Sequence, residues 1–263
     1  MLGFVRLLDA RMLALVVWWM AMFLEGTILF RAVYRKMASK YPLFYTYLAV
    51  VLAVDLARYI VYTFDPFAWA MFYWSTQFVS VLVGYGVILE ILKQALDPYP
   101  GAERFGRYLV LGVFVAVFAF VAFRSATRSN WSPAATTVEF ERDLRAVQVL
   151  VLMSILSVMF YYRIAVGRNL KGIILGYGLF IGTNMMNFAV RSYAGHQFNA
   201  WWKVFQPHSY VMVLIIWAGA LWSYYPNPIP KLPQRVESDY DTLASGTRGA
   251  LAAMRSHLGR AAR

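Results

Sequence analysis

A small set of charged and amide side chains lies inside long apolar stretches of this chain. An arginine well inside a lipid-embedded helix costs roughly 2.5 kcal/mol or more unless it meets water, a partner or the membrane interface. Such residues therefore mark either internal ion pairs or a water-accessible binding site. The candidates for a ligand site are Asp55, Arg58, Trp74, Gln77, Gln148, Asn184, Asn187, Arg191 and His208.

Arg58 has a possible partner in its own stretch, because Asp55 lies one turn earlier and on the same face of a helix. We expect this pair to point into the protein, either as a structural ion pair or as part of a site. Arg191 has no acidic residue within one turn. We expect Arg191 and Arg145, each taken singly, to extend outward to the membrane surface.

Two carboxyl groups lie toward the other side of the predicted membrane, Glu25 inside the first apolar stretch and Glu90 near the end of the third. A lone carboxylate at the depth of Glu25 is costly unless a cation or a proton neutralises it. Proton-coupled transporters use such acids. Two interpretations stay open for both residues, proton coupling or a structural contact. The structural contact would be a hydrogen bond to a neighbouring helix or, for Glu90, a salt bridge to a nearby Lys or Arg.

Aromatic residues gather at the outer ends of the apolar stretches, for example around Trp74 and around Trp201–Trp202. Tryptophan and tyrosine are enriched where a membrane meets water, so an interfacial belt explains most of them. The alternative for Trp74 is that it stacks on a bound ligand.

The residue types of this chain give little indication of a catalytic site. The chain has no cysteine and three histidines, so it has neither a thiolate site nor a histidine-rich metal site. It also lacks the short motifs of zinc proteases, serine hydrolases and phosphate-binding loops. We therefore expect no catalytic residues, no metal, no cofactor and no enzymatic activity.

The elements that position these residues are long apolar segments. Of the 263 residues 60% are hydrophobic and only 14% are charged, against about 25% charged in a soluble domain. About seven segments of roughly 18–25 residues are each long enough to cross a bilayer as a helix. Their expected ranges are 12–34, 43–64, 67–96, 107–124, 144–166, 171–193 and 207–225.

The sequence thus predicts an all-α membrane protein, a bundle of about seven transmembrane helices over residues 1–225. Residues 226–263 begin with a proline-rich leash. The remainder is basic, with leucines and a methionine near one helical face, and we expect it to be partly amphipathic or disordered.

Lysine and arginine set the expected orientation. They concentrate in the first, third and fifth connections and in the tail, whereas the second connection has none. The fourth connection holds Arg124, Arg128 and Arg142, partly offset by acidic residues. Positively charged connections stay on the cytoplasmic side, so we expect an outside N-terminus, a cytoplasmic tail and a multi-pass location in the cell membrane. The net charge of +12 then indicates attraction to acidic lipid rather than to nucleic acid.

With that orientation the ligand-site candidates fall in the outer halves of several helices and can converge on one outward-facing cavity. The sixth segment contains Gly172, Gly176, Gly178 and Gly182, which predicts close helix packing. Within their expected ranges, the segments have no proline in their interiors. This pattern disfavours a transporter with broken helices. A weak internal similarity suggests that segments one to three and five to seven are parallel repeats, which favours a transporter.

Three functional hypotheses follow. The first is a receptor-like or sensor-like protein that binds a small polar or acidic ligand and signals to an unidentified protein partner in the cytoplasm. The second is a small-solute or proton-coupled transporter with parallel three-helix repeats. The third is an accessory subunit of a membrane complex, which is preferred if the polar residues all pair internally.

Overall fold

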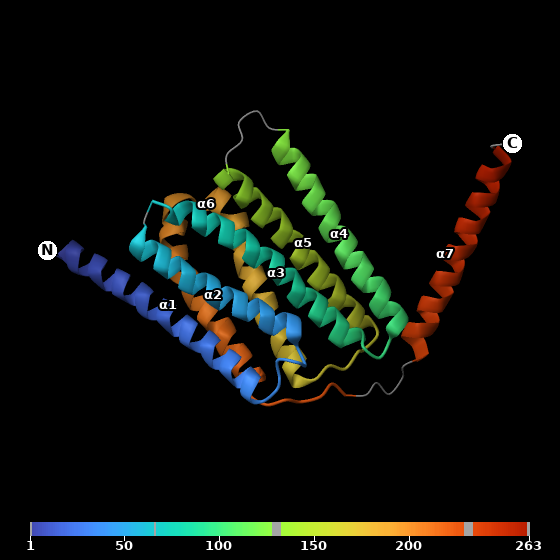
Figure 1. The fold of residues 1–263 in the computed structure, drawn as a ribbon, viewed down its shortest axis with the longest axis horizontal. Helices are drawn as coiled ribbons and strands as arrows, with labels where there is room; N and C mark the ends of the chain where they lie inside the picture. Colours follow the sequence, from blue (N-terminus) through green and yellow to red (C-terminus); the bar gives the residue numbers. More distant parts are fainter. Residues whose placement is uncertain (1, 66, 128–132, 229–233, 262–263) are drawn as a thin grey trace.

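The computed structural model describes residues 2–65, 67–127, 133–228 and 234–261, and these residues form helices and connections without a strand. The helices run alongside one another in a tilted bundle, from which the last helix stands apart (Figure 1). They are α1 (Leu2–Tyr34), α2 (Pro42–Phe64), α3 (Trp69–Leu96), α4 (Pro100–Ala126), α5 (Pro133–Tyr161), α6 (Arg168–Ala220) and α7 (Gln234–Ala261).

Five of these helices are long and apolar enough to cross a membrane, and Val204–Ala220 in α6 is a shorter apolar helix. Large apolar side chains on their outer faces are exposed, including Phe23 at 75% and Phe123 at 70%. Leaving so much apolar surface in water is unfavourable, whereas lipid accommodates it. The chain therefore has the architecture of a multi-pass helical membrane protein. The five spans are Leu15–Tyr34, Pro42–Phe64, Met71–Leu96, Pro100–Arg124 and Glu139–Tyr161.

The sixth and seventh predicted segments both lie in α6, which is continuous over 53 residues. A straight helix of that length would extend about 80 Å. Yet Asn169 Nδ2 donates to the carbonyl oxygen of Ala220 at 2.8 Å, so the two ends of α6 are in contact. The chain must therefore reverse direction within α6, and its later arm returns beside α1 (Figure 1). The seven-helix count and the orientation of the termini stay predictions.

Pro207 lies inside α6, whereas the sequence pattern placed it at the start of a segment. The expectation of proline-free helix interiors is therefore wrong for α6. The helix begins before Pro207 and continues through it, because a proline removes one hydrogen bond and bends a helix without necessarily ending it.

Glycines allow the two arms of α6 to pack closely, as expected for Gly172 and Gly176. A Cβ atom added to Gly172 would lie 2.0 Å from the Cβ of Ala220, and one added to Gly176 would lie 2.3 Å from Nε1 of Trp217. The Trp217 ring is fully buried and packs edge-on against Phe44 of α2, with ring centroids 5.0 Å apart. This contact joins α2 to the later arm of α6.

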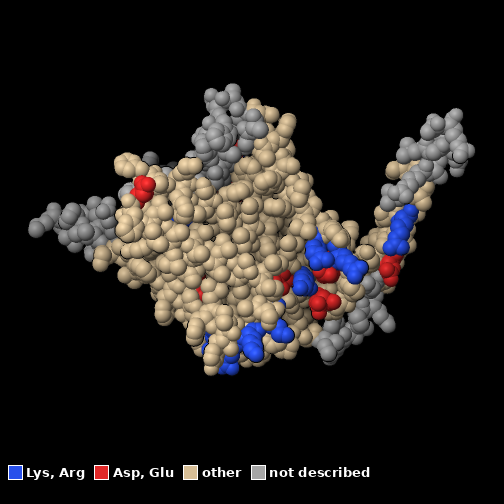
Figure 2. Space-filling model, in the orientation of Figure 1, with Lys and Arg blue, Asp and Glu red and all other residues tan. Residues whose placement is uncertain are grey.

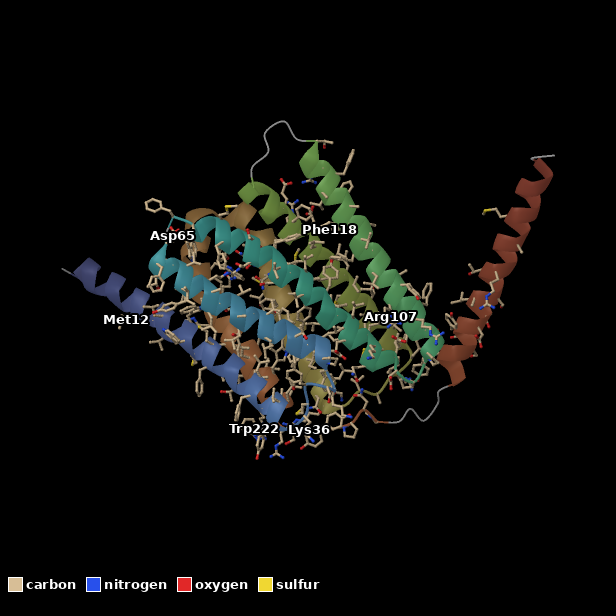
Figure 3. The ribbon with its side chains drawn as sticks, viewed as in Figure 1. Met12, Lys36, Asp65, Arg107, Phe118 and Trp222 are labelled. Atoms are coloured by element: carbon tan, nitrogen blue, oxygen red, sulfur yellow. The ribbon has the colours of Figure 1, made fainter. Side chains whose placement is uncertain are left out.

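The basic connections gather at one end of the bundle, where patches of Lys and Arg lie along the lower edge and lower right of Figure 2, on the right beside Asp and Glu. Hydrogen bonds join these connections: Gln94 Nε2 donates to the carbonyl oxygen of Lys40 at 2.8 Å, and Asn227 Nδ2 donates to that of Gln94 at 3.2 Å. Figure 3 shows Lys36 and Trp222 at this basic end and Asp65 at the opposite end. The predicted orientation depends on this gathering of basic connections at one end of the bundle.

Residues Gln234–Ala261 of the tail form a long helix, α7. Its first turns contact the bundle, where Tyr162 donates a hydrogen bond to Asp239 Oδ2 at 3.1 Å and Val236 is buried. The remainder of α7 stands away from the other helices in Figure 1. The boundary between membrane domain and tail at residue 225 stays a prediction.

The glycine contacts predict a position-specific effect on stability. Gly172→Ala should lower the free energy of unfolding by about 1–3 kcal/mol, because the added methyl group overlaps Ala220 and forces the arms of α6 apart. Gly182→Ala is the control, since a Cβ there meets nothing within 4 Å. Thermal unfolding in detergent measures both variants, and equal melting temperatures would contradict the close packing.

Candidate functional site

A cavity of about 390 Å³ lies between α1, α2, α3, α5 and α6. Its wall combines apolar side chains with charged and hydroxyl-bearing ones. The polar lining residues are Asp55, Arg58, Tyr73, Gln77, Ser80, Arg145, Asn184, Gln206, Ser209 and Tyr210. The apolar or aromatic ones are Val17, Trp18, Ala21, Tyr47, Val51, Phe180, Pro207 and Val213.

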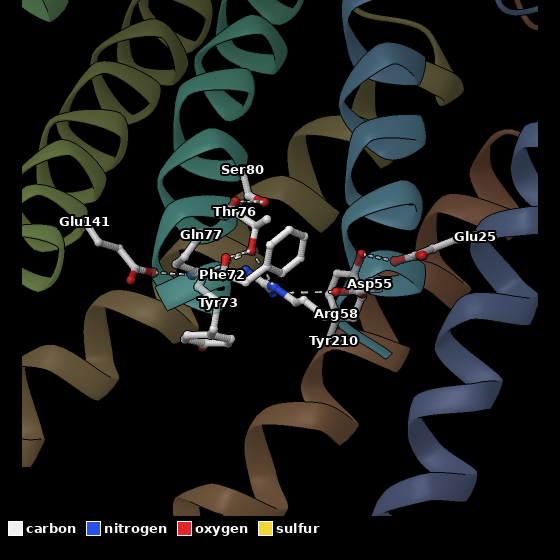
Figure 4. Close-up of polar contacts among 10 residues, drawn as sticks. All are labelled: Glu25, Asp55, Arg58, Phe72, Tyr73, Thr76, Gln77, Ser80, Glu141 and Tyr210. Carbon is white, nitrogen blue, oxygen red and sulfur yellow. Dashed lines mark hydrogen bonds and ion pairs between the residues drawn. The ribbon is translucent and has the colours of Figure 1, made fainter. Parts of the chain in front are cut away.

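Arg58 of α2 forms the predicted ion pair with Asp55, at 3.6 Å between NH1 and Oδ1. Its guanidinium group also crosses to α3, where Nε donates to Thr76 Oγ1 at 2.9 Å and NH2 donates to Gln77 Oε1 at 3.0 Å. The guanidinium carbon lies 4.5 Å from the centre of the Tyr73 ring, a cation–π distance. Figure 4 shows Arg58 directed from α2 toward these α3 side chains.

Gln77 connects this group to α5. Its Nε2 donates to Glu141 Oε1 at 2.6 Å, and Arg145 Nε donates to the same oxygen at 2.9 Å. The Gln77 amide therefore accepts a hydrogen bond from the Arg58 cation and donates one to the Glu141 carboxylate. We name the continuous series Asp55, Arg58, Gln77, Glu141 and Arg145 the polar chain; it crosses the bundle from α2 through α3 to α5.

Arg145 is buried, with a side chain only 4% exposed, so the expectation that it extends outward is wrong. Glu141 lies one turn earlier in α5, and its carboxylate offsets the free-energy cost of burying the guanidinium charge. Only Nε of the guanidinium group is used in this contact. NH1 and NH2 donate no hydrogen bond to any described residue, and the group lines the cavity with its centre 5.3 Å from the Phe180 ring.

Glu25 of α1 is fully buried just behind the cavity wall. The Tyr210 hydroxyl, which lines the cavity, donates to Glu25 Oε1 at 2.5 Å (Figure 4). Glu25 Oε2 is buried without a hydrogen-bond partner among the described residues. The structure therefore places Glu25 beside the ligand-site candidates, in hydrogen-bond contact with Tyr210 of the cavity wall.

Glu90, unlike Glu25, makes hydrogen bonds that hold neighbouring parts of the fold together. Its Oε2 accepts the backbone N–H of Leu43 at 2.9 Å, which satisfies a free amide at the start of α2, and its Oε1 accepts Gln94 Nε2 at 3.0 Å. The predicted salt bridge to a Lys or Arg does not form among the described residues. Leu43 lies about 18 Å along α2 from Asp55, so Glu90 is remote from the cavity.

The other predicted site residues divide into three groups. Asn184 lines the cavity and donates to the Phe180 carbonyl oxygen at 2.7 Å. Gln148 is buried outside the cavity lining and donates to the Val81 carbonyl oxygen at 3.0 Å, while Asn187 is half-buried and also outside it. His208 is exposed, with Nδ1 2.6 Å from the Val204 carbonyl oxygen, and does not line the cavity.

Trp74 and Arg191 complete the predicted set, and their side chains lie outside the described residues.

Sequence reasoning left several contributors out of the predicted site, among them Glu141, Arg145, Ser80 and Tyr210. Glu141 and Arg145 are four residues apart, a spacing that brings their side chains together on a helix and signals the pair. Ser80 lies one turn after Thr76 and Gln77 on the same face of α3. Tyr210 gave no local signal, because its role depends on α6 reversing beside α1.

Comparison of the chain with protein-family models, with curated proteins and with solved structures found no match.

The central position of Gln77 predicts a stability effect. Gln77→Leu should lower the free energy of unfolding by about 1–3 kcal/mol, because it leaves a donor of Arg58 and an acceptor of Glu141 without that partner. Ser75→Ala, on the same helix, removes an exposed hydroxyl bonded only to the backbone at Met71 and should change little. Chemical denaturation in detergent compares them, and equal stabilities would show that the polar chain contributes nothing at Gln77.

Proposed function

We propose that this multi-pass membrane protein is receptor-like or sensor-like and binds a small polar or acidic ligand in the cavity. The observation that carries the proposal is a cavity with two guanidinium groups in its wall, inside a bundle whose outer faces are apolar. Cavities of roughly 300–1,000 Å³ with a few convergent polar groups are typical small-molecule sites. The role is binding rather than catalysis, since no nucleophile and base converge among the described lining residues.

The cavity has a physical connection to the basic end of the bundle. Helices α2, α3 and α5 contribute Arg58, Gln77 and Arg145 to the cavity, and each continues to the end where the basic connections lie. With the predicted orientation, the cavity opens on the outer side of the cell membrane and the basic connections face the cytoplasm. A ligand that shifts these helices would alter the surface offered there to a cytoplasmic partner and to acidic lipid.

Filling the cavity tests the proposal without removing a charge. Ser80→Trp should abolish ligand binding, because Ser80 lines the cavity and an indole there occupies its space. Val79→Trp is the matched control, since Val79 is its exposed neighbour on α3. Both purified variants and the native protein are screened by thermal shift against small acids, sugars, nucleosides and amino acids.

A compound that raises the melting temperature of the native protein and of Val79→Trp, but not of Ser80→Trp, supports a ligand in this cavity. Failure of every compound class to stabilise the native protein, or equal stabilisation of all three proteins, would contradict it.

A second candidate function is a proton-coupled carrier, and two observations favour it. Glu25 is buried with one unpartnered oxygen and is connected to the cavity by Tyr210. Pro207 lines the same cavity inside α6, and an interrupted helix beside a binding site is a feature of transporters. The predicted repeat is compatible with this function. It aligns the end of the second segment with the end of the sixth, each followed by an aromatic turn and a glutamine, and these glutamines, Gln77 and Gln206, both line the cavity.

An accessory-subunit role is less well supported. It was expected if every buried polar group paired internally, whereas Arg145 and Glu25 keep unused hydrogen-bonding atoms among the described residues.

Coupling depends on Glu25 exchanging a proton. Uptake of a solute from the screen into liposomes, driven by a proton gradient, should be lost in Glu25→Gln. Glu90→Gln is the control, because a glutamine oxygen can still accept the Leu43 N–H and Glu90 is remote from the cavity. Uptake that proceeds without a gradient and is unchanged in Glu25→Gln would eliminate the coupled carrier.

A further inference from the structure

The unused edge of Arg145 identifies a ligand group. A guanidinium group presents NH1 and NH2 as a planar fork that matches the two oxygens of a carboxylate. In Arg145 the Nε side of the group is occupied by Glu141, whereas NH1 and NH2 have no partner among the described residues. The side chain is only 4% exposed, and it lines the cavity.

The fork is held in a fixed orientation, which a binding site requires. Glu141 fixes Nε at 2.9 Å, Gln77 fixes Glu141 at 2.6 Å, and Phe180 packs against the guanidinium group at 5.3 Å. A preorganised cation loses little conformational freedom when an anion binds. Arg58 differs, because its Nε and NH2 already donate to Thr76 and Gln77.

The charge of the cavity wall limits the charge of the ligand. Asp55 pairs with Arg58 and Glu141 pairs with Arg145, so the two ion pairs carry no net charge, and any charge on a ligand adds to a neutral wall. The donors NH1 and NH2 of Arg145 can meet a single negative charge, whereas a dianion would bring in a second buried charge without a partner, and unpaired buried charge is costly.

The remaining wall limits the rest of the ligand. Val17, Ala21, Val51, Phe180 and Val213 form apolar surface in the same cavity. An apolar ligand body gains free energy by leaving water for such a surface, while a strongly hydrated body does not.

We infer that the cavity binds a small organic monocarboxylate with an apolar body, whose carboxylate accepts hydrogen bonds from NH1 and NH2 of Arg145. This inference rests on the proposed binding function and specifies the chemical class of its ligand. Asp55 shapes the selectivity, because its negative charge offsets Arg58 and keeps the cavity from attracting more highly charged anions.

Matched probes test the ligand class on the native protein. Benzoate, phenylacetate and hexanoate are compared with benzamide, phenylacetamide and hexanamide, which have nearly the same shapes but no charge. Equilibrium dialysis of radiolabelled probes against the full chain in detergent gives the affinities. At least one acid should bind about 30-fold more tightly than its amide, the effect of one charge-assisted contact in a buried site.

Variants then test the residue. Arg145→Gln combined with Glu141→Gln removes the ion pair as a unit, leaves no isolated charge, and should abolish the preference for acid over amide. Arg145→Lys keeps the charge without the fork and should retain part of that preference. Asp55→Asn should increase the affinity for the acid, because it leaves the charge of Arg58 uncompensated and makes the cavity wall net positive. A purely structural role for these residues predicts no such increase.

The outcomes distinguish the two levels of the proposal. Acids that bind no better than their amides, or an acid preference that survives in the double variant, would overturn the inference. If another compound class binds and Ser80→Trp abolishes that binding, the cavity is still a ligand site and only the carboxylate assignment fails. If neither the probes nor any compound class binds, both the proposed function and this inference fail.

Discussion

The cost of burying charge in an apolar bundle is the constraint on which the rest of this structure depends. Arg58 and Arg145 project inward, and each is stable there because a carboxylate of its own helix lies within one turn. Gln77 joins the two ion pairs by accepting from Arg58 and donating to Glu141. The polar chain therefore fixes the mutual positions of α2, α3 and α5, and its unused donors define one wall of the cavity.

The closure of α6 on itself completes that cavity from the other side. Gly172 and Gly176 allow its two arms to approach, and the later arm brings Tyr210 to Glu25 of α1. The apolar packing and the polar site are thus consequences of the same reversal. The site exists only when α6 has folded back, so a ligand bound there stabilises the closed arrangement of the helices.

Much of the fold was predictable because its signal is local. The length and apolar character of the first five segments predict spanning helices, and the spacing of Asp55 and Arg58 predicts their ion pair. Gln77 and Asn184 were selected only because polar groups are rare in such helices, and both line the cavity. Selecting single polar residues succeeded at these positions because lipid favours apolar residues along the whole helix, so that each polar residue stands out.

Two kinds of contact were not anticipated from the sequence. The first joins segments that are distant in the chain, and the second joins neighbouring residues that were considered one at a time. Arg145 was expected to point outward because Glu141 was counted with the preceding connection rather than as its helical partner. For Glu90 the sequence left proton coupling and a structural contact both open, and the contact it makes is with the backbone N–H of Leu43, 47 residues away in the chain. His208 lies at a suitable height for the site but on an exposed face, and height alone does not specify which face of a helix points inward.

Water accessibility of the cavity is the most direct test of a ligand site, and the absence of cysteine from the chain makes it clean. The rate at which Ser80→Cys reacts with a small anionic thiol reagent in membranes should greatly exceed that of Val79→Cys. Thiolate chemistry requires water, and an anionic reagent that enters the cavity meets the NH1 and NH2 donors of Arg145, which have no partner among the described residues. A Ser80→Cys variant as unreactive as Val79→Cys would show a dry cluster of structural ion pairs, contradicting a binding cavity.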